Sequence, residues 1–183
     1  MIATHTIPDA FSPAECDRIL ALADAAPLRD AGLVRGQHDH GQRRAELAWL
    51  DEAEGGEWVM DRLVDVVRRA NRSVFDFELT DFAESPQVAR YGAERAGHFD
   101  WHADIGEGAV AARRKLTMVV QLSEPADYAG GGLEIMPSAA IITAPTQRGA
   151  ATLFPSFMLH RVTPVTEGVR RSLTVWVHGP AFR

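Results

Sequence analysis

The sequence has little cysteine, no long hydrophobic run and no excess of positive charge. The single cysteine, Cys16, excludes an internal disulfide framework and a CxxC zinc finger, and it is typical of a reducing compartment. The first residues, MIATHTIPDAFSP, contain neither the basic segment nor the apolar segment of a signal peptide. No apolar run approaches the roughly 20 residues that a membrane span needs. We therefore expect a cytoplasmic protein without a membrane-spanning segment.

The balance of charges disfavours two further classes of protein. Lys and Arg total 19 while Asp and Glu total 25, which gives a formal charge of −6 at pH 7. Such a balance argues against a nucleic-acid coat and against a polybasic membrane binder. The 183 residues are 46% hydrophobic, which is enough for one ordinary core. We expect one domain over residues 1–183, with a helix-containing part in 1–85 and a β-rich core in 86–183.

Two amphipathic helices are predicted in the first part of the chain. Residues 12–26 begin with a capping box, in which Ser12 is the N-cap, Pro13 opens the helix and Glu15 stands three residues after the cap. A second helix is predicted from about Glu54 to Asn71. Apolar residues recur at helical spacing in both, at Cys16, Ile19, Leu20 and Ala23 and at Val59, Leu63, Val66, Val67 and Ala70. Both helices are expected to cover one face of a sheet.

From Pro86 onward the pattern changes to short β-forming segments. They read QVARY, HFDWHAD, KLTMVVQLS, GLEIMPS, AIITA, GAATLFP, HRVTPV and RRSLTVWVH, with turn residues between them, as in 124–132. Closely spaced strands without intervening helices favour antiparallel pairing in a small barrel or jelly roll. The predicted fold is therefore mainly β with flanking helices.

Two histidines and one aspartate form a candidate metal site. His102 and Asp104 stand two residues apart in a predicted strand, so both side chains can point to the same face. His160 lies 58 residues later, on another predicted strand, and can supply a third ligand. Two imidazoles and one carboxylate on a common face are typical of non-haem Fe(II) oxygenases, which keep open positions on the metal.

A cation and a hydroxyl follow His160 at a spacing that supports this interpretation. Arg170 and Ser172 are two residues apart in a strongly β-forming stretch, so both can face the interior with Thr174 and Trp176. Fe(II) with two neutral imidazoles and one carboxylate keeps a net positive charge. A dicarboxylate anion can therefore bind to this metal. A guanidinium nearby can then hold the remote carboxylate in a bidentate manner, with Ser172 as an additional donor.

Several motifs together resemble one known family. HADIG, KLTMVVQLS, DYAGG followed by LEI, and FPSFMLHRVTPVTEGVRRS are similar to the Fe(II)- and 2-oxoglutarate-dependent oxygenases of the prolyl 4-hydroxylase-like group. The likeness is strongest to bacterial PKHD-type hydroxylases and is dense from Tyr91 to Val177. The chain does not show the carboxy-terminal extension that is common in PKHD proteins.

The resemblance implies a double-stranded β-helix of cupin-like form and a hydroxylase that acts on an unactivated C–H bond. It implies iron at His102, Asp104 and His160, and 2-oxoglutarate held by Arg170 with help from Ser172 and Tyr91. O2 is the other cosubstrate, with ascorbate as an optional reductant. The substrate implied is a peptidyl side chain of prolyl type or an amino-acid-like small molecule.

A second His-x-Asp pair stands directly before the first. The strand reads His98-Phe99-Asp100-Trp101-His102-Ala103-Asp104, and regular alternation would put both pairs on one face. Either pair can supply the ligands. The second pair is preferred because family members often have an aromatic residue before the histidine and a loop after the aspartate, here at 105–108. His98 and Asp100 would then contact the ligands or the substrate.

Other candidates and two rival functions stay open. His38-Asp39-His40 also spaces two imidazoles by two residues, but its polar surroundings favour a loop near the site entrance. Gly130-Gly131-Gly132 favours a β-turn over a phosphate loop. Trp101, Phe99 and Phe154 can form an aromatic wall or part of the core. The rival functions are a non-catalytic metal-binding module and a zinc hydrolase.

Overall fold

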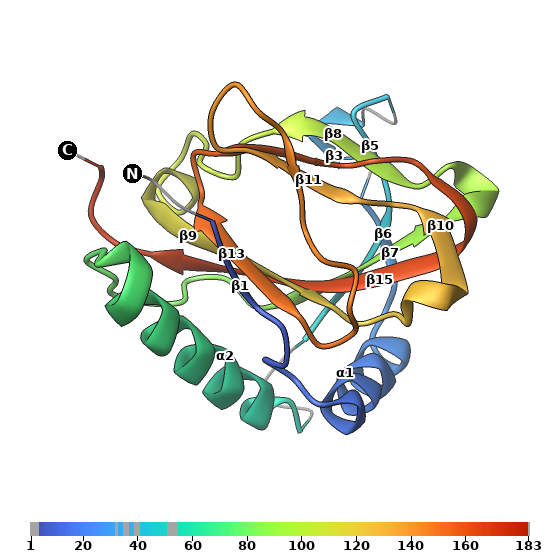
Figure 1. The fold of residues 1–183 in the computed structure, drawn as a ribbon, viewed down its shortest axis with the longest axis horizontal. Coiled ribbons are helices and arrows are strands. Elements are labelled where there is room, and N and C mark those ends of the chain that lie inside the picture. Colours follow the sequence, from blue (N-terminus) through green and yellow to red (C-terminus); the bar gives the residue numbers. More distant parts are fainter. Residues whose placement is uncertain (1–3, 32, 35–36, 39–40, 51–54, 183) are drawn as a thin grey trace.

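Two antiparallel β-sheets face each other, and two helices cover the outer side of the larger sheet (Figure 1). This computed structural model describes residues 4–31, 33–34, 37–38, 41–50 and 55–182. The helices are α1 (Pro13–Ala25) and α2 (Glu57–Ala70). The strands are β1 (His5–Ile7), β2 (Arg29–Asp30), β3 (Leu33–Val34), β4 (Gln37–His38), β5 (Arg43–Arg44), β6 (Glu46–Trp49), β7 (Gln87–Gly92), β8 (His98–His102), β9 (Arg114–Gln121), β10 (Tyr128–Gly130), β11 (Leu133–Met136), β12 (Ile142–Thr143), β13 (Ala151–Pro155), β14 (Leu159–Val162) and β15 (Val165–His178).

The larger sheet has the order β1-β13-β9-β15-β7-β6-β2, with β10 paired to β15, and the smaller has the order β12-β11-β14-β8-β5. The remaining two-stranded sheet is β3-β4. Consecutive strands of the core repeatedly cross from one large sheet to the other, as β7, β8 and β9 do. The structure therefore confirms the predicted jelly roll, or double-stranded β-helix, with flanking helices.

The two helices form largely where the sequence predicts them. Ser12 caps α1 as expected: the Glu15 amide donates to Ser12 Oγ at 3.2 Å, and the Ser12 amide donates to Glu15 Oε2 at 2.7 Å. The predicted start of the second helix at Glu54 lies outside the described residues. This helix continues beyond α2 as one π-helical turn, Asn71–Phe75. Its five predicted apolar residues are all buried. Neither helix is long and apolar enough to cross a membrane.

Each of the eight segments predicted after Pro86 contains a strand, but several strands were not predicted. In the first part of the chain, β1 pairs with β13, β6 pairs with β7 and β5 pairs with β8, so this part extends both sheets. These strands are short and lack a clear apolar alternation. Residues 128–130, which were expected in a turn, form β10 and pair with β15.

Alternation along the central strands separates a structural face from an inner face. On β9, Leu116, Met118 and Val120 pack in the main core together with residues of both helices. Thr117, Val119 and Gln121 point the other way, into the space between the sheets. On β15 the outer residues are Leu173, Val175 and Val177. The inner face of β15 therefore presents its buried polar residues toward the smaller sheet.

Candidate metal centre and dicarboxylate site

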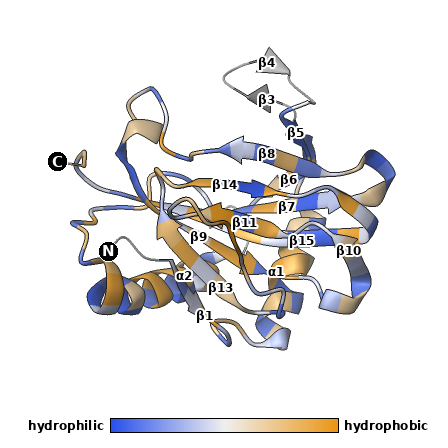
Figure 2. Cartoon of the chain, turned by 45° about the horizontal axis from the view of Figure 1, so that its top comes forward, coloured by the Kyte–Doolittle hydropathy of each residue, from blue (hydrophilic) through white to orange (hydrophobic). Residues whose placement is uncertain are grey.

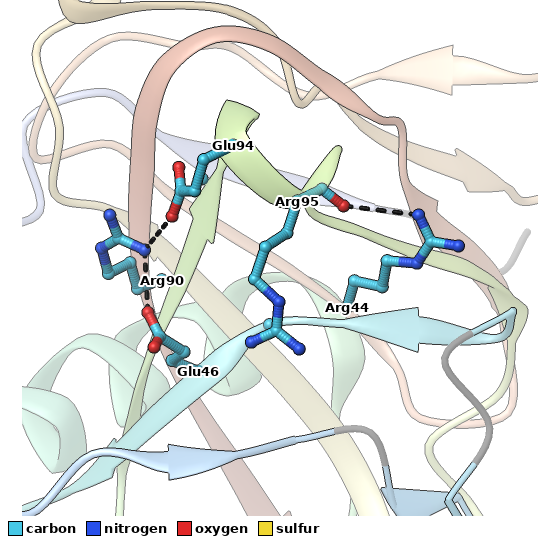
Figure 3. Close-up of a pocket in the computed structure, with 7 residues that line it drawn as sticks. Arg44, Glu46, Arg90, Glu94 and Arg95 are labelled. Atoms are coloured by element: carbon cyan, nitrogen blue, oxygen red, sulfur yellow. Dashed lines mark hydrogen bonds and ion pairs between the residues drawn. The ribbon is translucent and has the colours of Figure 1, made fainter.

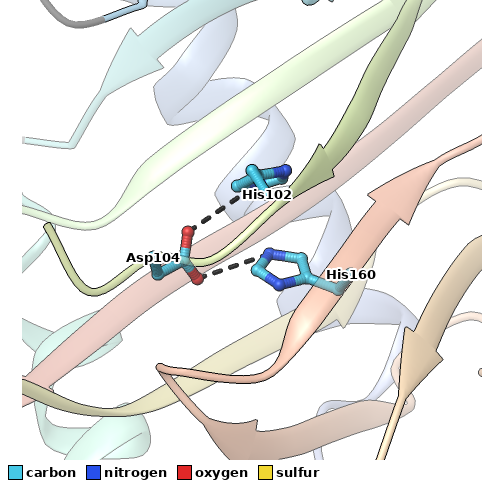
Figure 4. Close-up of side chains that lie close together, drawn as sticks. All are labelled: His102, Asp104 and His160. Carbon is cyan, nitrogen blue, oxygen red and sulfur yellow. Dashed lines mark ion pairs between the residues drawn. The ribbon is translucent and has the colours of Figure 1, made fainter. Parts of the chain in front are cut away.

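His102, Asp104 and His160 come together between the two sheets. We refer to these three residues as the triad. Each offers one ligand atom, and these atoms all lie within 4.8 Å of one another. The two imidazoles lie next to each other, with ring centroids 4.1 Å apart, and each faces one oxygen of the carboxylate: His102 Nε2 is 3.6 Å from Asp104 Oδ1, and His160 Nε2 is 3.4 Å from Asp104 Oδ2 (Figure 4). The three donor atoms therefore converge on one point that a metal ion can occupy.

Backbone carbonyl groups orient both imidazoles. His102 Nδ1 lies 2.7 Å from the Asp100 carbonyl oxygen, and His160 Nδ1 lies 3.0 Å from the Met158 carbonyl oxygen. A carbonyl can only accept, so each Nδ1 must carry the hydrogen in these contacts. Each Nε2 is then left with its lone pair directed toward the triad. This arrangement, in which the outer nitrogen is anchored by hydrogen bonding, is common for histidines that bind metals.

Asp104 is anchored from β9 and from the segment after β13. Thr117 Oγ1 donates to Asp104 Oδ2 at 2.7 Å, and the Asp104 amide donates to the Ser156 carbonyl oxygen at 2.9 Å. Burial raises the pKa of Asp104, but the adjacent His160 and His102 imidazoles and the hydrogen bond from Thr117 outweigh this effect and hold the pKa well below its usual range. The side chain is therefore an anion that is ready to bind a cation.

Burial determines the protonation of His160. Its side chain lies in the interior, and burial lowers its pKa to about 4, although the negative charge of Asp104 opposes the shift. His160 is consequently neutral at pH 7. A neutral imidazole is the form that coordinates a metal, so no proton has to leave before binding.

A β-bulge in β8 distinguishes the two His-x-Asp pairs. His102 pairs with His160, whereas Phe99 pairs with Val162, so β8 has one residue more than β14 between these positions. The bulge turns Phe99 to the same side as His102, and their rings stack with centroids 3.5 Å apart. The prediction that both pairs share one face is therefore wrong, because alternation breaks at this bulge.

The side chains of the first pair, His98 and Asp100, contact backbone groups outside the triad. His98 Nδ1 lies 2.9 Å from the Ala96 carbonyl oxygen and Nε2 lies 2.9 Å from the Gly41 carbonyl oxygen. Both ring nitrogens are thus engaged with backbone oxygens. The Asp100 side chain is exposed and accepts a hydrogen bond from the Trp101 amide at 2.8 Å. Asp100 reaches the triad through its carbonyl group, which anchors His102, and not through its carboxylate.

Arg170 is a buried cation on the inner face of β15. Its side chain is 1% exposed, and Nη2 donates to Gln121 Oε1 at 3.0 Å. Nη1 is buried and has no hydrogen-bond partner in the described part of the chain. Burial lowers the pKa of Arg170, while Tyr91 and Tyr128 raise it. An unpartnered guanidinium N–H in the interior is unfavourable unless an acceptor binds there, so Arg170 is suited to an anionic ligand.

Tyr91 and Ser172, the other residues expected to help Arg170, are both buried near it. Tyr91 is buried on β7, opposite Arg170 in the register, with the guanidinium carbon 5.6 Å from its ring centroid. Ser172 is buried two residues further along β15. Arg171, between them, faces outward and pairs with Asp24 of α1 at 2.6 Å. Arg170, Ser172 and Tyr91 thus surround one region of the interior.

Strand β9 connects this region to the triad. Thr117 contacts Asp104, and Gln121 contacts Arg170. These two residues are four positions apart on the same face of one strand, which corresponds to about 13 Å between their backbones. Val119 lies between them and packs with Ile135 and Phe154 in an apolar cluster. A small molecule with a charged group at each end can therefore extend from the triad to Arg170 along an apolar wall.

The sequence analysis did not identify Thr117, Gln121 and Tyr128. The first two are polar residues on the inward-facing positions of the buried run KLTMVVQL, and that alternation is the signal that could have found them. Gly131 was interpreted only as a turn residue. At Gly131, where φ is +63°, an added Cβ would lie 3.0 Å from Arg170 Cδ, so the turn packs directly against Arg170.

The remaining candidates lie elsewhere or stay untested. Asp39 and His40 are outside the described residues, so the possible His38-Asp39-His40 site stays a prediction. Phe99 and Phe154 flank the two imidazoles, with Phe154 4.7 Å from His160 between ring centroids. Trp101 instead lies under Arg161, at 4.8 Å.

A shallow surface hollow is separate from the triad and is occupied by ion pairs. In it Arg90 lies between Glu46 and Glu94, at 2.8 Å and 2.6 Å (Figure 3). Arg90 is thus paired with both glutamates, and Arg95 pairs with Asp30 at 3.1 Å, so these ion pairs of the hollow stabilise the fold.

Comparison with known proteins agrees with this geometry. The profile of the 2OG-Fe(II) oxygenase superfamily matches residues 86–178, about half of the chain, and this range includes the triad and Arg170. The chain belongs to this superfamily. A PKHD-type hydroxylase of Bordetella pertussis is 31% identical over 93% of this chain and 76% of its own length, and one of Phenylobacterium zucineum is 30% identical over the same shares.

Solved structures of the superfamily share the fold of this oxygenase. A prolyl-4-hydroxylase of Pseudomonas putida superposes with a TM-score of 0.75 at 21% identity, over 99% of this chain and 95% of the other. A prolyl hydroxylase of Trichoplax adhaerens superposes with a TM-score of 0.78 at 19% identity, over 96% and 83%. These similarities support the double-stranded β-helix.

Membership establishes the cofactors and the class of reaction. The protein is a hydroxylating dioxygenase that uses Fe(II), 2-oxoglutarate and O2. The residues present fit these groups. Two Nε2 atoms and one ionised carboxylate are the donor set of non-haem Fe(II) oxygenases, and the unpartnered Nη1 of Arg170 suits a carboxylate oxygen. A zinc hydrolase would have no use for this second feature.

Proposed function

We propose that this oxygenase hydroxylates an unactivated C–H bond in a peptidyl side chain of prolyl type or in an amino-acid-like molecule. In this proposal His102, Asp104 and His160 hold Fe(II), and Arg170 holds 2-oxoglutarate with help from Ser172 and Tyr91. The catalytic core lies in residues 86–183, within a single domain. The observation that carries the assignment is the combination of a converging triad with a buried, unpartnered Nη1 of Arg170 on the same side of β9.

The substrate class rests on the relatives. The Trichoplax adhaerens prolyl hydroxylase is described in complex with a peptide fragment of the hypoxia inducible factor oxygen degradation domain. The curated relatives are PKHD-type hydroxylases. A peptide substrate is therefore our first expectation, and a free amino-acid-like molecule is the second. Ascorbate as a reductant, the cytoplasmic location and the absence of a nucleic-acid or membrane partner stay predictions.

The bound cofactors supply the oxidation, in which 2-oxoglutarate is converted to succinate and CO2 while the substrate gains one oxygen atom. The protein provides position and environment. The carbonyl groups of Asp100 and Met158 keep Nδ1 protonated on both histidines, so that each Nε2 lone pair points inward. Thr117 fixes one oxygen of Asp104.

The rest of the interior binds the cosubstrate and excludes water. Arg170, itself held by Gln121, offers Nη1 to the carboxylate of 2-oxoglutarate that is remote from the metal. Val119 and Phe154 line the apolar wall between the two ends. Excluding water in this way protects a reactive centre from side reactions.

Incubation of the protein with Fe(II), 2-oxoglutarate and a fractionated cell extract tests the proposal. We expect succinate and a product heavier than its precursor by one oxygen atom, and the added mass should follow the isotope when isotopically heavy O2 is supplied. The Asp104→Ala variant, treated identically, is the control and should give neither product. If the wild-type protein forms no succinate with any fraction, the enzymatic assignment fails. Succinate without an oxygenated peptide or amino-acid-like product contradicts only the substrate class.

A further inference from the structure

Arg43 lies on the inner side of the smaller sheet, next to the triad. It belongs to the edge strand β5, which pairs with β8, and both lie at one side of this sheet (Figure 2). Arg43 is opposite Phe99 in the register, while Arg44 is opposite His98. Directly opposed side chains of an antiparallel pair share a face. Arg43 thus lies on the side of Phe99, and Arg44 lies on the other side.

Phe99 separates the Arg43 guanidinium from a member of the triad. The Arg43 Cζ atom is 4.4 Å from the centroid of the Phe99 ring, and the His102 ring is stacked on Phe99 with centroids 3.5 Å apart. Two groups this close to one centroid cannot occupy the same face of the ring. Arg43, Phe99 and His102 therefore form three layers, and the cation is one aromatic ring away from the imidazole.

The charge of Arg43 has no carboxylate partner among the residues that the structure describes. Its Nε atom is buried and makes no hydrogen bond there. Other arginines near the two sheets are paired: Arg95 with Asp30 at 3.1 Å, and Arg161 with Glu134 at 2.7 Å. Arg90 and Arg171 are paired as well. Arg43 is therefore unlike the arginines that stabilise the fold.

This arrangement leaves the Nε–H of Arg43 without an acceptor among the described residues. Stacking on an aromatic ring occupies the face of a guanidinium and leaves its donors, which lie in the plane, free to bind. A buried N–H without an acceptor is unfavourable, and a bound anion would remove that penalty. A carboxylate matches the fork of the guanidinium and its single charge.

We propose that Arg43 is a substrate-recognition residue that binds a carboxylate of the molecule to be hydroxylated. This inference rests on the proposed function and narrows its substrate class to molecules with a carboxylate near the reacting C–H bond. The carboxylate can be terminal, as in a free amino acid or at the end of a peptide, or it can belong to an acidic side chain within a peptide.

Nuclear magnetic resonance of the arginine Nε–H groups tests the inference without knowledge of the substrate. The protein would contain 2-oxoglutarate and Zn(II) in place of Fe(II), so that signals near the site stay sharp. The Arg43 signal is assigned by its loss in Arg43→Lys. The probes are N-acetylglycine for a terminal carboxylate and N-acetylaspartate α-methylamide for a side-chain carboxylate. Their neutral counterparts are N-acetylglycine methylamide and N-acetylasparagine methylamide.

At least one carboxylate probe should shift the Arg43 signal to saturation and bind on the order of tenfold more tightly than its neutral counterpart. The probe that does so identifies the source of the carboxylate. Arg43→Gln should abolish this preference, whereas Arg44→Gln, on the opposite face of β5, should retain it. The inference is overturned if neither carboxylate gives a saturable shift, if the neutral probes bind equally well, or if Arg43→Gln keeps the preference.

A parallel measurement separates this inference from the proposed function. Succinate formation by the wild-type protein with Fe(II), 2-oxoglutarate and the fractionated cell extract is recorded in the same buffer. If wild type forms no succinate but shows the carboxylate preference, the oxidation is contradicted and the anion site stands. If succinate forms and the preference is absent, only the role of Arg43 is contradicted.

Discussion

A His-x-Asp motif begins at each end of strand β8, and the two motifs lie in very different surroundings. At the start of the strand, both ring nitrogens of His98 contact backbone oxygens and Asp100 is exposed. At the end, His102 turns its Nε2 inward and Asp104 is buried with a hydroxyl partner. The difference arises from the bulge opposite β14, which turns the second half of the strand toward the interior. A motif therefore indicates a site only when the backbone directs it there.

The same contrast recurs between neighbours on β15. Arg170 faces the interior with an unpartnered Nη1, whereas Arg171 pairs with Asp24 on the surface of α1. In both strands the residue with the functional assignment is the one turned inward, and its neighbour in the sequence has a structural contact. Substitutions of such neighbouring pairs can test the contrast directly.

The largest effect is expected at Arg170. Arg170→Gln should weaken 2-oxoglutarate binding by about 2–5 kcal/mol, because a charged partner of a buried carboxylate is removed. Anaerobic titration of the visible band that forms when 2-oxoglutarate binds to the Fe(II) protein measures this change. Arg171→Gln is the matched control and should leave the dissociation constant nearly unchanged. If Arg171→Gln weakened 2-oxoglutarate binding more than Arg170→Gln, Arg171 and not Arg170 would be the residue that faces the cosubstrate.

The stability of the metal-free protein should depend on pH because His160 is buried. Burial lowers the pKa of His160 to about 4, compared with 6.5 for an unperturbed histidine. Between these values the unfolded chain binds more protons than the folded one, so the stability of the metal-free protein falls as the pH falls through this window. The loss should be about 1.4 kcal/mol per pH unit, or about 3 kcal/mol in total.

Urea unfolding of the metal-free protein across this pH window measures the effect. His160→Gln should flatten the dependence, because the group that titrates only in the unfolded chain is gone. Thr152→Val, which removes no titratable group, serves as the comparison and should keep the slope of the wild type. An unchanged slope in His160→Gln would show that another group is responsible.

A smaller effect is expected from the hydroxyl group that anchors Asp104. Thr117→Val keeps the shape of the side chain but removes the hydrogen bond to Asp104 Oδ2. Loss of such an outer partner typically weakens metal binding about 10–100-fold, so Fe(II) affinity should fall within this range. Thr152→Val is a suitable control, because this buried threonine of β13 contacts Thr6 instead of the triad. Equal losses in both variants would indicate a general loss of stability.

Much of the fold followed from the sequence because the strongest patterns are local. The capping box at Ser12, the apolar face of α2 and the strands after Pro86 are each determined by residues close together in the chain. The short strands of the first part were missed because they form by pairing with distant edges. Their own side chains show no alternation that would predict them.

The candidate site was predictable in its residue types but not in its geometry. His102, Asp104, His160 and Arg170 stand out by type and spacing, and the structure brings the first three together. The β8 bulge depends on pairing with β14, so regular alternation gave the wrong face for His98 and Asp100. The alternation in KLTMVVQL could have indicated Gln121, but Tyr128 is brought to Arg170 only by the pairing of β10 with β15.

Iron content of two single variants tests the central claim most directly. Asp104→Ala and Asp100→Ala remove the same group from positions four residues apart, and each protein is loaded with Fe(II) under anaerobic conditions, desalted and analysed for metal. Our account predicts close to one Fe(II) per chain in the wild type and in Asp100→Ala, and almost none in Asp104→Ala. Loss of iron from Asp100→Ala together with its retention in Asp104→Ala would contradict the assignment.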